Sequence, residues 1–457
     1  MRVDDARRPE MRKRRWFGMA LAAAALWAII MEPSAWAKIL GVQGTSFQLV
    51  AKQDRITLGD GDSVVMWGFA LGDGRMQYPG PTLIVNQGDT ITVSLKNALP
   101  ATAGNVSILF PGHDVAASGG VAGVLTQEAP PDGTTTVTYT FTAGKPGTYV
   151  YHSGTRPDLQ VEMGLLGVIV VRPTNPTPNS DCPPVPDGHN AGPNPSLCTG
   201  TKFAYNHSDT AYDREFLMVM TDMDPRVHRL VEFGRMNEID TTSFFQTVWF
   251  ANGRNFPDTI ANAQVPWLPT QPYNALFLMH PGERILVRMA TLGRDPHPLH
   301  FHGNHVRVIA KDGRLLSSSS GKGPDLSYER YTVVVNPGET VDAIFTWTGA
   351  LMGWDIYGHA PGDDLAPYEF VADHGANFPV ILPSRDDVVF GLLYSGSPFL
   401  GGEGSLPPEH AGLNVGGGFF YMWHSHTEKE LANNNIFPGG LITFLGVVPW
   451  DVPLEAE

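Results

Sequence analysis

The chain has 457 residues, of which 42% are hydrophobic and 17% are charged, a balance that supports sizeable apolar cores and argues against a fully disordered protein. The formal net charge of -15 argues against nucleic acid as a partner, because phosphate recognition needs a basic surface. The 50 glycines and 38 prolines favour many short strands joined by turns. The length allows two to three domains.

The amino terminus, residues 1–37, reads as a secretory signal peptide. Its basic start is followed by an apolar run over residues 16–31, and Ala35-Trp36-Ala37 supplies the small residues of a cleavage site. The run is shorter than the about 20 apolar residues that cross a bilayer, so no stable membrane span is expected. The pair Arg14-Arg15 fits a twin-arginine signal, the alternative being an ordinary signal with a basic start. The protein is therefore expected to be periplasmic or extracellular.

Strand-like alternation with turn residues between the strands occurs twice along the rest of the chain. The first copy is predicted over residues 38–172 and the second over residues 206–457. Two landmarks relate them: residues 149–154 match residues 421–426, and residues 106–109 match residues 299–302. The prediction is an all-β protein built from two Greek-key β-sandwich domains of one repeated plan.

Two irregular segments interrupt this pattern. Residues 173–205 are rich in proline, asparagine and glycine and predict a linker. Both cysteines, Cys182 and Cys198, lie in it, and export favours a disulfide that closes the loop over metal ligation by the thiolates. Residues from about 360 to 418 predict a large insertion in the second domain, which could form a flap over a site.

The chemistry is expected at two His-x-His pairs, His300 with His302 and His424 with His426. Side chains two residues apart in a strand point to the same face, so each pair presents two imidazoles together. Two such strands side by side make a cluster of four imidazoles. Neutral imidazole binds copper, zinc, iron and nickel, so the pattern predicts a transition-metal site without selecting the ion.

Several side chains near the two His-x-His pairs allow two interpretations. Glu428 and Glu430 could add oxygen ligands or orient an imidazole, but a solvated charged turn is favoured. His359 could approach the cluster, although a surface position is favoured. His113 and His305 fall out of alternation with the pairs and are set aside. Three methionines in FLMVMTDM could handle copper, and core packing is preferred for them: Met218, Met220 and Met223.

Three motifs resemble the multicopper oxidase superfamily, whose domains are cupredoxin sandwiches, and its copper nitrite reductase relatives. They are YPGPTLIVNQGDTITVSLKN, HPLHFHG and WHSH. The resemblance implies cupredoxin-like domains and a trinuclear-type copper centre with ligands His300, His302, His424 and His426. It also implies a fifth ligand at His152, and it places His297 where the family carries a ligand of its blue type-1 copper.

The chain departs from the family pattern at several ligand positions. Ser425 stands where the family has the type-1 cysteine, and a hydroxyl does not replace that soft thiolate. The next type-1 histidine would fall near Glu430. In the first copy, the partner pair is expected at residues 107–109, which carry no histidine. The later pair keeps only its first histidine, His152, and has Gly154 in place of the second. Five of the family's eight trinuclear ligands remain, which implies one or two copper ions and no type-1 copper.

The functional hypothesis is an exported copper-dependent oxidoreductase that lacks the type-1 copper. It would react with oxygen or a nitrogen oxide and take electrons from a small-molecule or metal-ion reductant, or from a redox partner protein docked on the acidic surface. The alternative is a non-catalytic periplasmic copper carrier or structural cupredoxin protein. A weaker alternative is zinc or iron in the same site. A homotrimer follows only by analogy with two-domain relatives.

Overall fold

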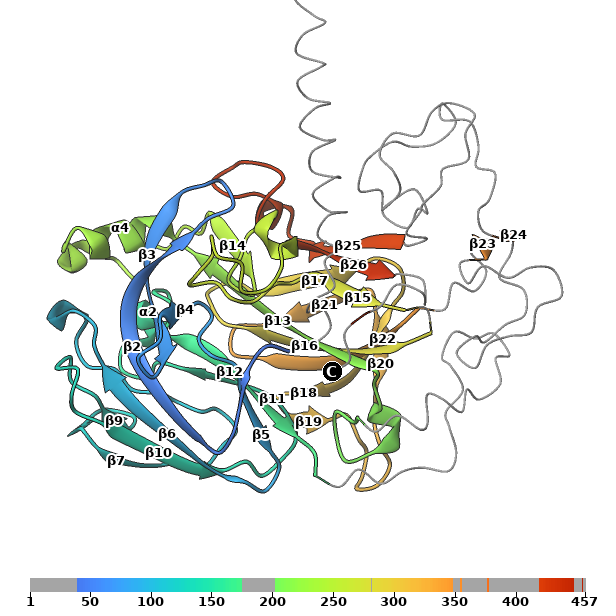
Figure 1. Ribbon diagram of the computed structural model, residues 1–457, viewed down its shortest axis with the longest axis horizontal. Coiled ribbons are helices and arrows are strands. Elements are labelled where there is room, and N and C mark those ends of the chain that lie inside the picture. The colour runs from blue at the N-terminus through green and yellow to red at the C-terminus, as the bar shows by residue number, and fades with distance from the viewer. Residues whose placement is uncertain are drawn as a thin grey trace, which may run out of the picture.

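Two β-sandwiches, one after the other in the chain, make up the protein as the computed structural model describes it (Figure 1). The predicted all-β class is confirmed. The predicted signal peptide, the two cysteines and the predicted insertion lie almost entirely outside the described residues, which are 39–174, 202–280, 282–347, 354–355, 376–377, 419–447 and 454.

The first sandwich packs a four-stranded sheet, ordered β1-β5-β12-β11, against a six-stranded sheet, ordered β4-β3-β2-β6-β10-β7. Alternate residues of β6 are buried, because successive side chains point to opposite faces, whereas β11 and β12 are buried along most of their length. The short helix α2 (Pro157–Gln160) lies between β11 and β12. The strands are β1 (Val42–Gln43), β2 (Ser46–Thr57), β3 (Ser63–Leu71), β4 (Met76–Gln77), β5 (Leu83–Asn86), β6 (Thr90–Asn97), β7 (Ala116–Gly119), β8 (Val121–Ala122), β9 (Gln127–Glu128), β10 (Val137–Thr142), β11 (Gly147–His152) and β12 (Leu166–Arg172).

The second sandwich packs a seven-stranded sheet, β14-β13-β16-β22-β18-β19 with β20 paired to β18, against a five-stranded sheet, β15-β26-β25-β17-β21. Helix α4 (Pro225–Glu232) follows β13, and the side chain of Asp224 caps its amino terminus. The strands are β13 (Arg214–Met223), β14 (Val248–Ala251), β15 (Phe277–Met279), β16 (Arg284–Thr291), β17 (His297–Phe301), β18 (Val306–Lys311), β19 (Arg314–Leu315), β20 (Tyr328–Arg330), β21 (Thr332–Val335), β22 (Thr340–Thr346), β25 (Phe419–Ser425) and β26 (Ile442–Val447), besides the separate pair β23 (Trp354–Asp355) and β24 (Ala376–Asn377).

The two sandwiches repeat one plan, as the sequence predicts. β11 pairs antiparallel with β12, which pairs parallel with β5. In the same way, β25 pairs antiparallel with β26, which pairs parallel with β15. β11 and β25 are therefore equivalent strands, and His152 is the counterpart of His424.

The register between the copies differs from the predicted one by two residues. Leu109 bridges His152, whereas His300 pairs with His424, so Leu109 rather than residue 107 is the counterpart of His300. Gly112 and Gly303 then match, and both have positive φ, at 88° and 98°. HFHG in the second copy thus corresponds to residues 109–112, LFPG, which contain no histidine.

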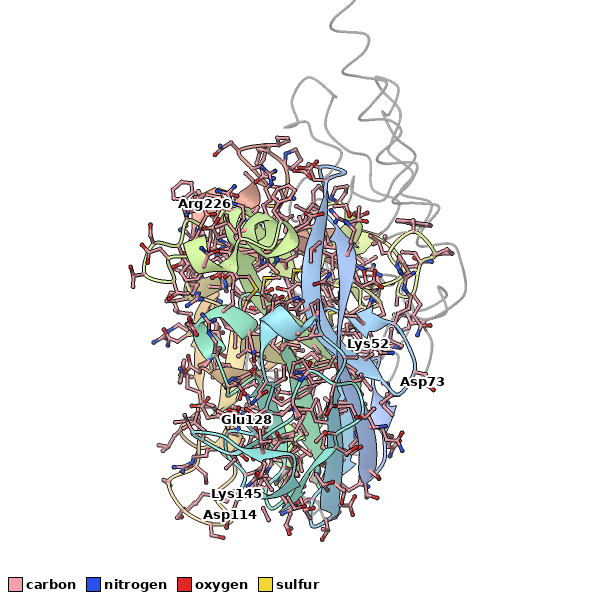
Figure 2. All side chains as sticks on the ribbon, turned by 90° about the vertical axis from the view of Figure 1, so that its left-hand side faces the viewer. Lys52, Asp73, Asp114, Glu128, Lys145 and Arg226 are labelled. Carbon is pink, nitrogen blue, oxygen red and sulfur yellow. The ribbon has the colours of Figure 1, made fainter. Side chains whose placement is uncertain are left out.

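Polar side chains join the sandwiches to each other. Thr148 of the first sandwich donates to Asp342 at 2.6 Å, and the buried Arg288 pairs with both Asp342 and Glu215. Charged side chains cover the outside, with Asp114 and Lys145 at one end and Arg226 of α4 at the other (Figure 2).

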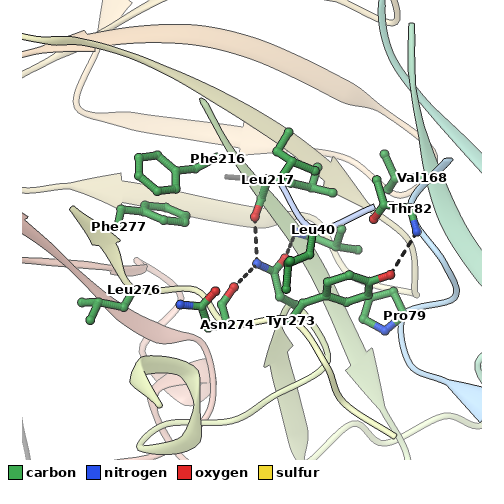
Figure 3. Close-up of a pocket in the computed structure, with 13 residues that line it drawn as sticks. Leu40, Pro79, Thr82, Val168, Phe216, Leu217, Tyr273, Asn274, Leu276 and Phe277 are labelled. Carbon is green, nitrogen blue, oxygen red and sulfur yellow. Dashed lines mark hydrogen bonds between the residues drawn. The ribbon is translucent and has the colours of Figure 1, made fainter. Parts of the chain in front are cut away.

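A pocket of mixed polar and apolar lining lies at the junction of the sandwiches, where the Tyr273 hydroxyl accepts the backbone N–H of Thr82 at 3.0 Å (Figure 3). None of the four paired histidines lines it. Its lining is Ile39, Leu40, Pro79, Thr82, Val168, Phe216, Leu217, Val219, Asn252, Tyr273, Asn274, Leu276 and Phe277.

Candidate metal centre

The two His-x-His pairs lie at the ends of neighbouring strands, as predicted, with His302 and His426 one residue beyond β17 and β25. β17 and β25 run antiparallel, and His300 is directly opposite His424. Phe301 lies between His300 and His302, and Trp423 directly precedes His424; both are buried in the core of the second sandwich. Strand alternation therefore turns the histidines to the other face of the sheet.

The four imidazole rings form one cluster. The ring centre of His300 lies 4.8 Å from that of His302, 4.8 Å from that of His426 and 5.3 Å from that of His424. One ring nitrogen from each of His300, His302 and His424 lies within 4.8 Å of the others. The Nε2 atoms of His302 and His424 are 3.3 Å apart. Two nitrogens bound to one tetrahedral ion with bonds of 2.0–2.1 Å are also separated by about 3.3 Å.

Polar contacts fix the far side of three of these rings, two of them hydrogen bonds and one a contact with a carboxylate. The Nδ1 atom of His424 donates to the carbonyl of Ser425 at 2.7 Å. The Nδ1 atom of His426 lies 2.9 Å from a carboxylate oxygen of Glu428. The Nδ1 atom of His300 bonds the hydroxyl of Thr332 at 2.7 Å. Such partners set the ring orientation and the tautomer of a metal-binding histidine. Nε2 is then the nitrogen that each ring offers to a metal.

Three imidazoles of the cluster favour the uncharged form: those of His300, His302 and His424. Burial lowers the pKa of His302 to about 4, helped by the neighbouring imidazoles. Burial first, and then the neighbouring rings, also lower the pKa of His300, while burial lowers the pKa of His424. Because a metal binds the neutral imidazole, the lowered pKa values of these three histidines favour metal binding at neutral pH.

One side of the cluster is open to solvent. The side chain of His426 is 50% exposed, and that of its partner Glu428 is 73% exposed. Tyr331, 58% exposed, lies at the rim with its ring centre 5.6 Å from that of His300. His305 contacts the same tyrosine at 5.3 Å. As far as the described residues go, a small molecule can therefore reach the cluster from this side.

His297 does not join the cluster. It lies three residues before His300, so strand alternation places it on the inner face with Leu299. Its Nδ1 atom is 2.9 Å from Glu430 Oε2, and its Nε2 atom is 3.7 Å from Asp222 Oδ2. Glu430 is fully buried, so the expectation of a solvated turn is wrong for this residue. Asp222 was missed by the sequence reading, and its only signal is a charge inside an apolar strand.

His152 is not part of the group of converging histidines found among the described residues. It ends β11 in the first sandwich, and its Nδ1 donates to the carbonyl of Ser153 at 2.9 Å, as His424 does to Ser425. At the other three equivalent positions the first sandwich has Leu109, Pro111 and Gly154. His152 is therefore the one histidine at these four equivalent positions of the first sandwich.

The remaining candidates have structural positions. Met218, Met220 and Met223 are fully buried in hydrophobic clusters, so the prediction of core packing is confirmed. His113 is packed between Phe141 and Tyr149, with ring centres 4.7 and 4.6 Å away. His359 lies outside the described residues.

The paired sheets and their repeated order define the class: this is a protein of two cupredoxin-like β-sandwiches. Comparison with known proteins narrows the class. A family model described as multicopper oxidase matches residues 72–176, and a second with the same description matches residues 238–353. The chain belongs to the multicopper oxidase superfamily.

Individual relatives agree with this assignment. The chain is 27% identical over 300 residues to copper resistance protein A of Escherichia coli, an alignment that covers 58% of this chain and 43% of that protein. It thus spans less than half the length of that relative.

Two solved structures share the fold. Blue copper oxidase from Nitrosomonas europaea has a TM-score of 0.51 at 19% identity, covering 88% of this chain and 85% of that chain. Multicopper oxidase mgLAC has a TM-score of 0.52 at 19% identity, covering 91% and 88%.

The family implies copper, and the residues present fit it. Imidazole nitrogens are good copper ligands, and four of them converge here with their Nδ1 sides largely occupied.

In the described part of the chain, no helix is long and apolar enough to cross a membrane.

Proposed function

We propose that this protein is an exported copper-dependent oxidoreductase that uses a histidine centre on β17 and β25. The observation that supports it is the convergence of His300, His302 and His424, whose ring nitrogens lie within 4.8 Å of one another. His426 completes the centre from the solvent side. The solvent-open rim supports a small-molecule or metal-ion reductant, or a docked redox protein, as electron donor.

We also propose that the protein contains no type-1 copper. The two positions where the family carries type-1 histidines are His297 and Glu430, and here they bond each other at 2.9 Å. Ser425, in the place of the family's cysteine, accepts the backbone N–H of Thr427 through its hydroxyl at 3.1 Å. The two histidine positions are thus occupied by a hydrogen-bonded pair, His297 and Glu430. The thiolate position is occupied by a hard hydroxyl oxygen, whereas type-1 copper needs soft sulfur.

The residues of the centre would share the work as follows. His302 and His424, with Nε2 atoms 3.3 Å apart, would hold one ion together with His300, and His426 would add a fourth nitrogen or hold a second ion. Bound copper supplies one-electron redox chemistry. Thr332 and Glu428 orient their imidazoles, and the exposed rim admits the reductant.

A copper carrier without turnover is the second candidate. Two observations favour it: the histidine cluster is exposed on one side, and the type-1 position is closed by the bond between His297 and Glu430. An exposed imidazole site can take up and release an ion without electron transfer. Both candidates use the same four ligands.

One experiment tests the proposal and separates the two candidates. The purified protein is loaded with Cu²⁺, its copper is counted per chain, and its absorbance, electron paramagnetic resonance and oxygen uptake with phenol and ferrous donors are recorded. The oxidoreductase predicts one or two copper ions, no intense blue band and donor-dependent oxygen uptake. Bound copper without turnover over the donor panel supports the carrier, and no bound copper refutes both.

A further inference from the structure

A second group of ionisable side chains lies behind the histidine centre, on the inner face of β17. His297, Asp222 and Glu430, here called the inner triad, have fully buried side chains. The His297 Nδ1 atom is 2.9 Å from Glu430, and its Nε2 atom is 3.7 Å from Asp222. Neither His297 Nε2 nor Glu430 Oε1 has a hydrogen-bond partner among the described residues. One imidazole is thus placed between two carboxylates away from solvent.

The protonation of His297 follows from these contacts. The Glu430 oxygen can only accept when ionised, so His297 Nδ1 carries a proton and donates it. With that proton alone, the lone pair of Nε2 would face the Asp222 carboxylate, which is unfavourable in a buried site. A second proton on Nε2 turns this repulsion into attraction, and 3.7 Å is a distance suited to an ion pair.

Other groups around the triad are consistent with an ionised Asp222. Its carboxylate accepts the backbone N–H groups of Arg294 at 3.0 Å and Asp295 at 2.7 Å. Burial nevertheless raises the pKa of Asp222 to about 6, with a smaller contribution from Glu162, while His297 lowers it. Glu162 belongs to the first sandwich and faces both the imidazole of His228 and the guanidinium of Arg294.

We propose that His297 is a buried imidazolium held between Glu430 and Asp222, and that this triad positions the two strand segments of the metal centre. His297 precedes His300 by three residues on β17, and Glu430 follows His426 by four residues beyond β25. Their bond joins the two ligand-bearing segments on the side away from the cluster.

Asp222 extends this connection to the opposite sheet. It lies on β13 in the seven-stranded sheet, whereas β17 and β25 lie in the five-stranded sheet. The triad therefore connects both sheets and the 3₁₀ turn that carries Glu430, Glu428–Leu431. The positioning role rests on the proposed metal centre, but the protonation state does not.

The protonation state is tested first, on the metal-free full chain. Nuclear magnetic resonance with ¹⁵N-labelled histidine reports the protonation of each ring nitrogen, and His297→Gln assigns the signal. The triad predicts protons on both nitrogens of His297 at neutral pH. A single protonated nitrogen would overturn it.

The positioning role is tested by the Kd for Cu²⁺ in Glu430→Gln and Asp222→Asn, with apo thermal stability measured beside it. The matched control is Glu283→Gln, which neutralises a buried carboxylate 3.3 Å from His280 in the same sandwich. Glu430→Gln is expected to weaken copper binding about tenfold, and the control is expected to leave it unchanged.

The outcomes separate the two proposals. Unchanged copper affinity in both triad variants, or an equal loss in the control, overturns the positioning role. If the wild-type chain binds no copper, the metal centre fails with the positioning role, and the resonance experiment alone decides the imidazolium.

Discussion

The hydrogen bond between Thr332 and His300 gives the sharpest test of how the centre is held. Thr332 lies on β21, the edge strand beside β17, and its hydroxyl is 2.7 Å from His300 Nδ1. Thr332→Val keeps the β-branched shape and removes the hydroxyl, so the strand should be undisturbed. The imidazole loses the contact that turns Nε2 toward its neighbours.

The size of the effect follows from the lost bond. A neutral hydrogen bond contributes about 0.5–1.5 kcal/mol, which corresponds to about a 2- to 12-fold increase in the Kd for copper. The assay is a competition titration of Cu²⁺ against a chromogenic chelator, with the melting temperature of the apo protein as a check on folding. Thr332→Ser retains the oxygen and serves as the control.

Two results would refute this reasoning. Thr332→Val with wild-type copper affinity would mean that the hydroxyl does not orient His300 toward an ion. Thr332→Ser as weak as the valine variant would mean that packing of the methyl group, not the hydrogen bond, matters.

Three further predictions concern pH and packing. The pKa of His302 is about 4 in the folded protein and 6.5 in the unfolded chain, so between these pH values the folded state binds fewer protons. The stability of the apo protein should therefore fall as the pH drops from 6.5 to about 4, which chemical denaturation at several pH values would show. Met220→Ala should cost about 2–5 kcal/mol of unfolding free energy and leave copper stoichiometry unchanged, whereas a copper-handling methionine would lose metal. Gly303→Ala should lower the melting temperature, since its φ is +98° and a Cβ would lie 3.0 Å from the Tyr421 ring.

The cluster itself could be predicted from the sequence because it depends on a local rule. His300 and His302, like His424 and His426, are two residues apart in strands, so each pair had to share a face. Only the adjacency of the two strands was uncertain, and the repeated sandwich plan supplied it. The same rule, applied to His297, would have placed it on the opposite face.

The inner triad could not be predicted in the same way. Glu430 lies in TEKELANNN, which is typical of a charged surface turn, and only its contact with His297, 133 residues away in the chain, explains its burial. Asp222 comes from a third distant segment. Long-range pairing of this kind leaves no periodic pattern in the sequence.

The register of the first sandwich was misjudged for a related reason. Residues 107–109 and 109–111 both fit a strand with alternating faces, so the pattern allowed a two-residue slip. The bridge from Leu109 to His152 fixes the register, as the pair His300 and His424 does in the second copy. Neither register places a histidine there.

The most direct measurement of the central claim is a crystal structure of the copper-loaded protein with anomalous diffraction collected at the copper absorption edge. The four-imidazole centre predicts a strong peak bonded to the Nε2 atoms of His300, His302 and His424. A peak at His297 or at the surface, with these three rings unbound, would contradict it.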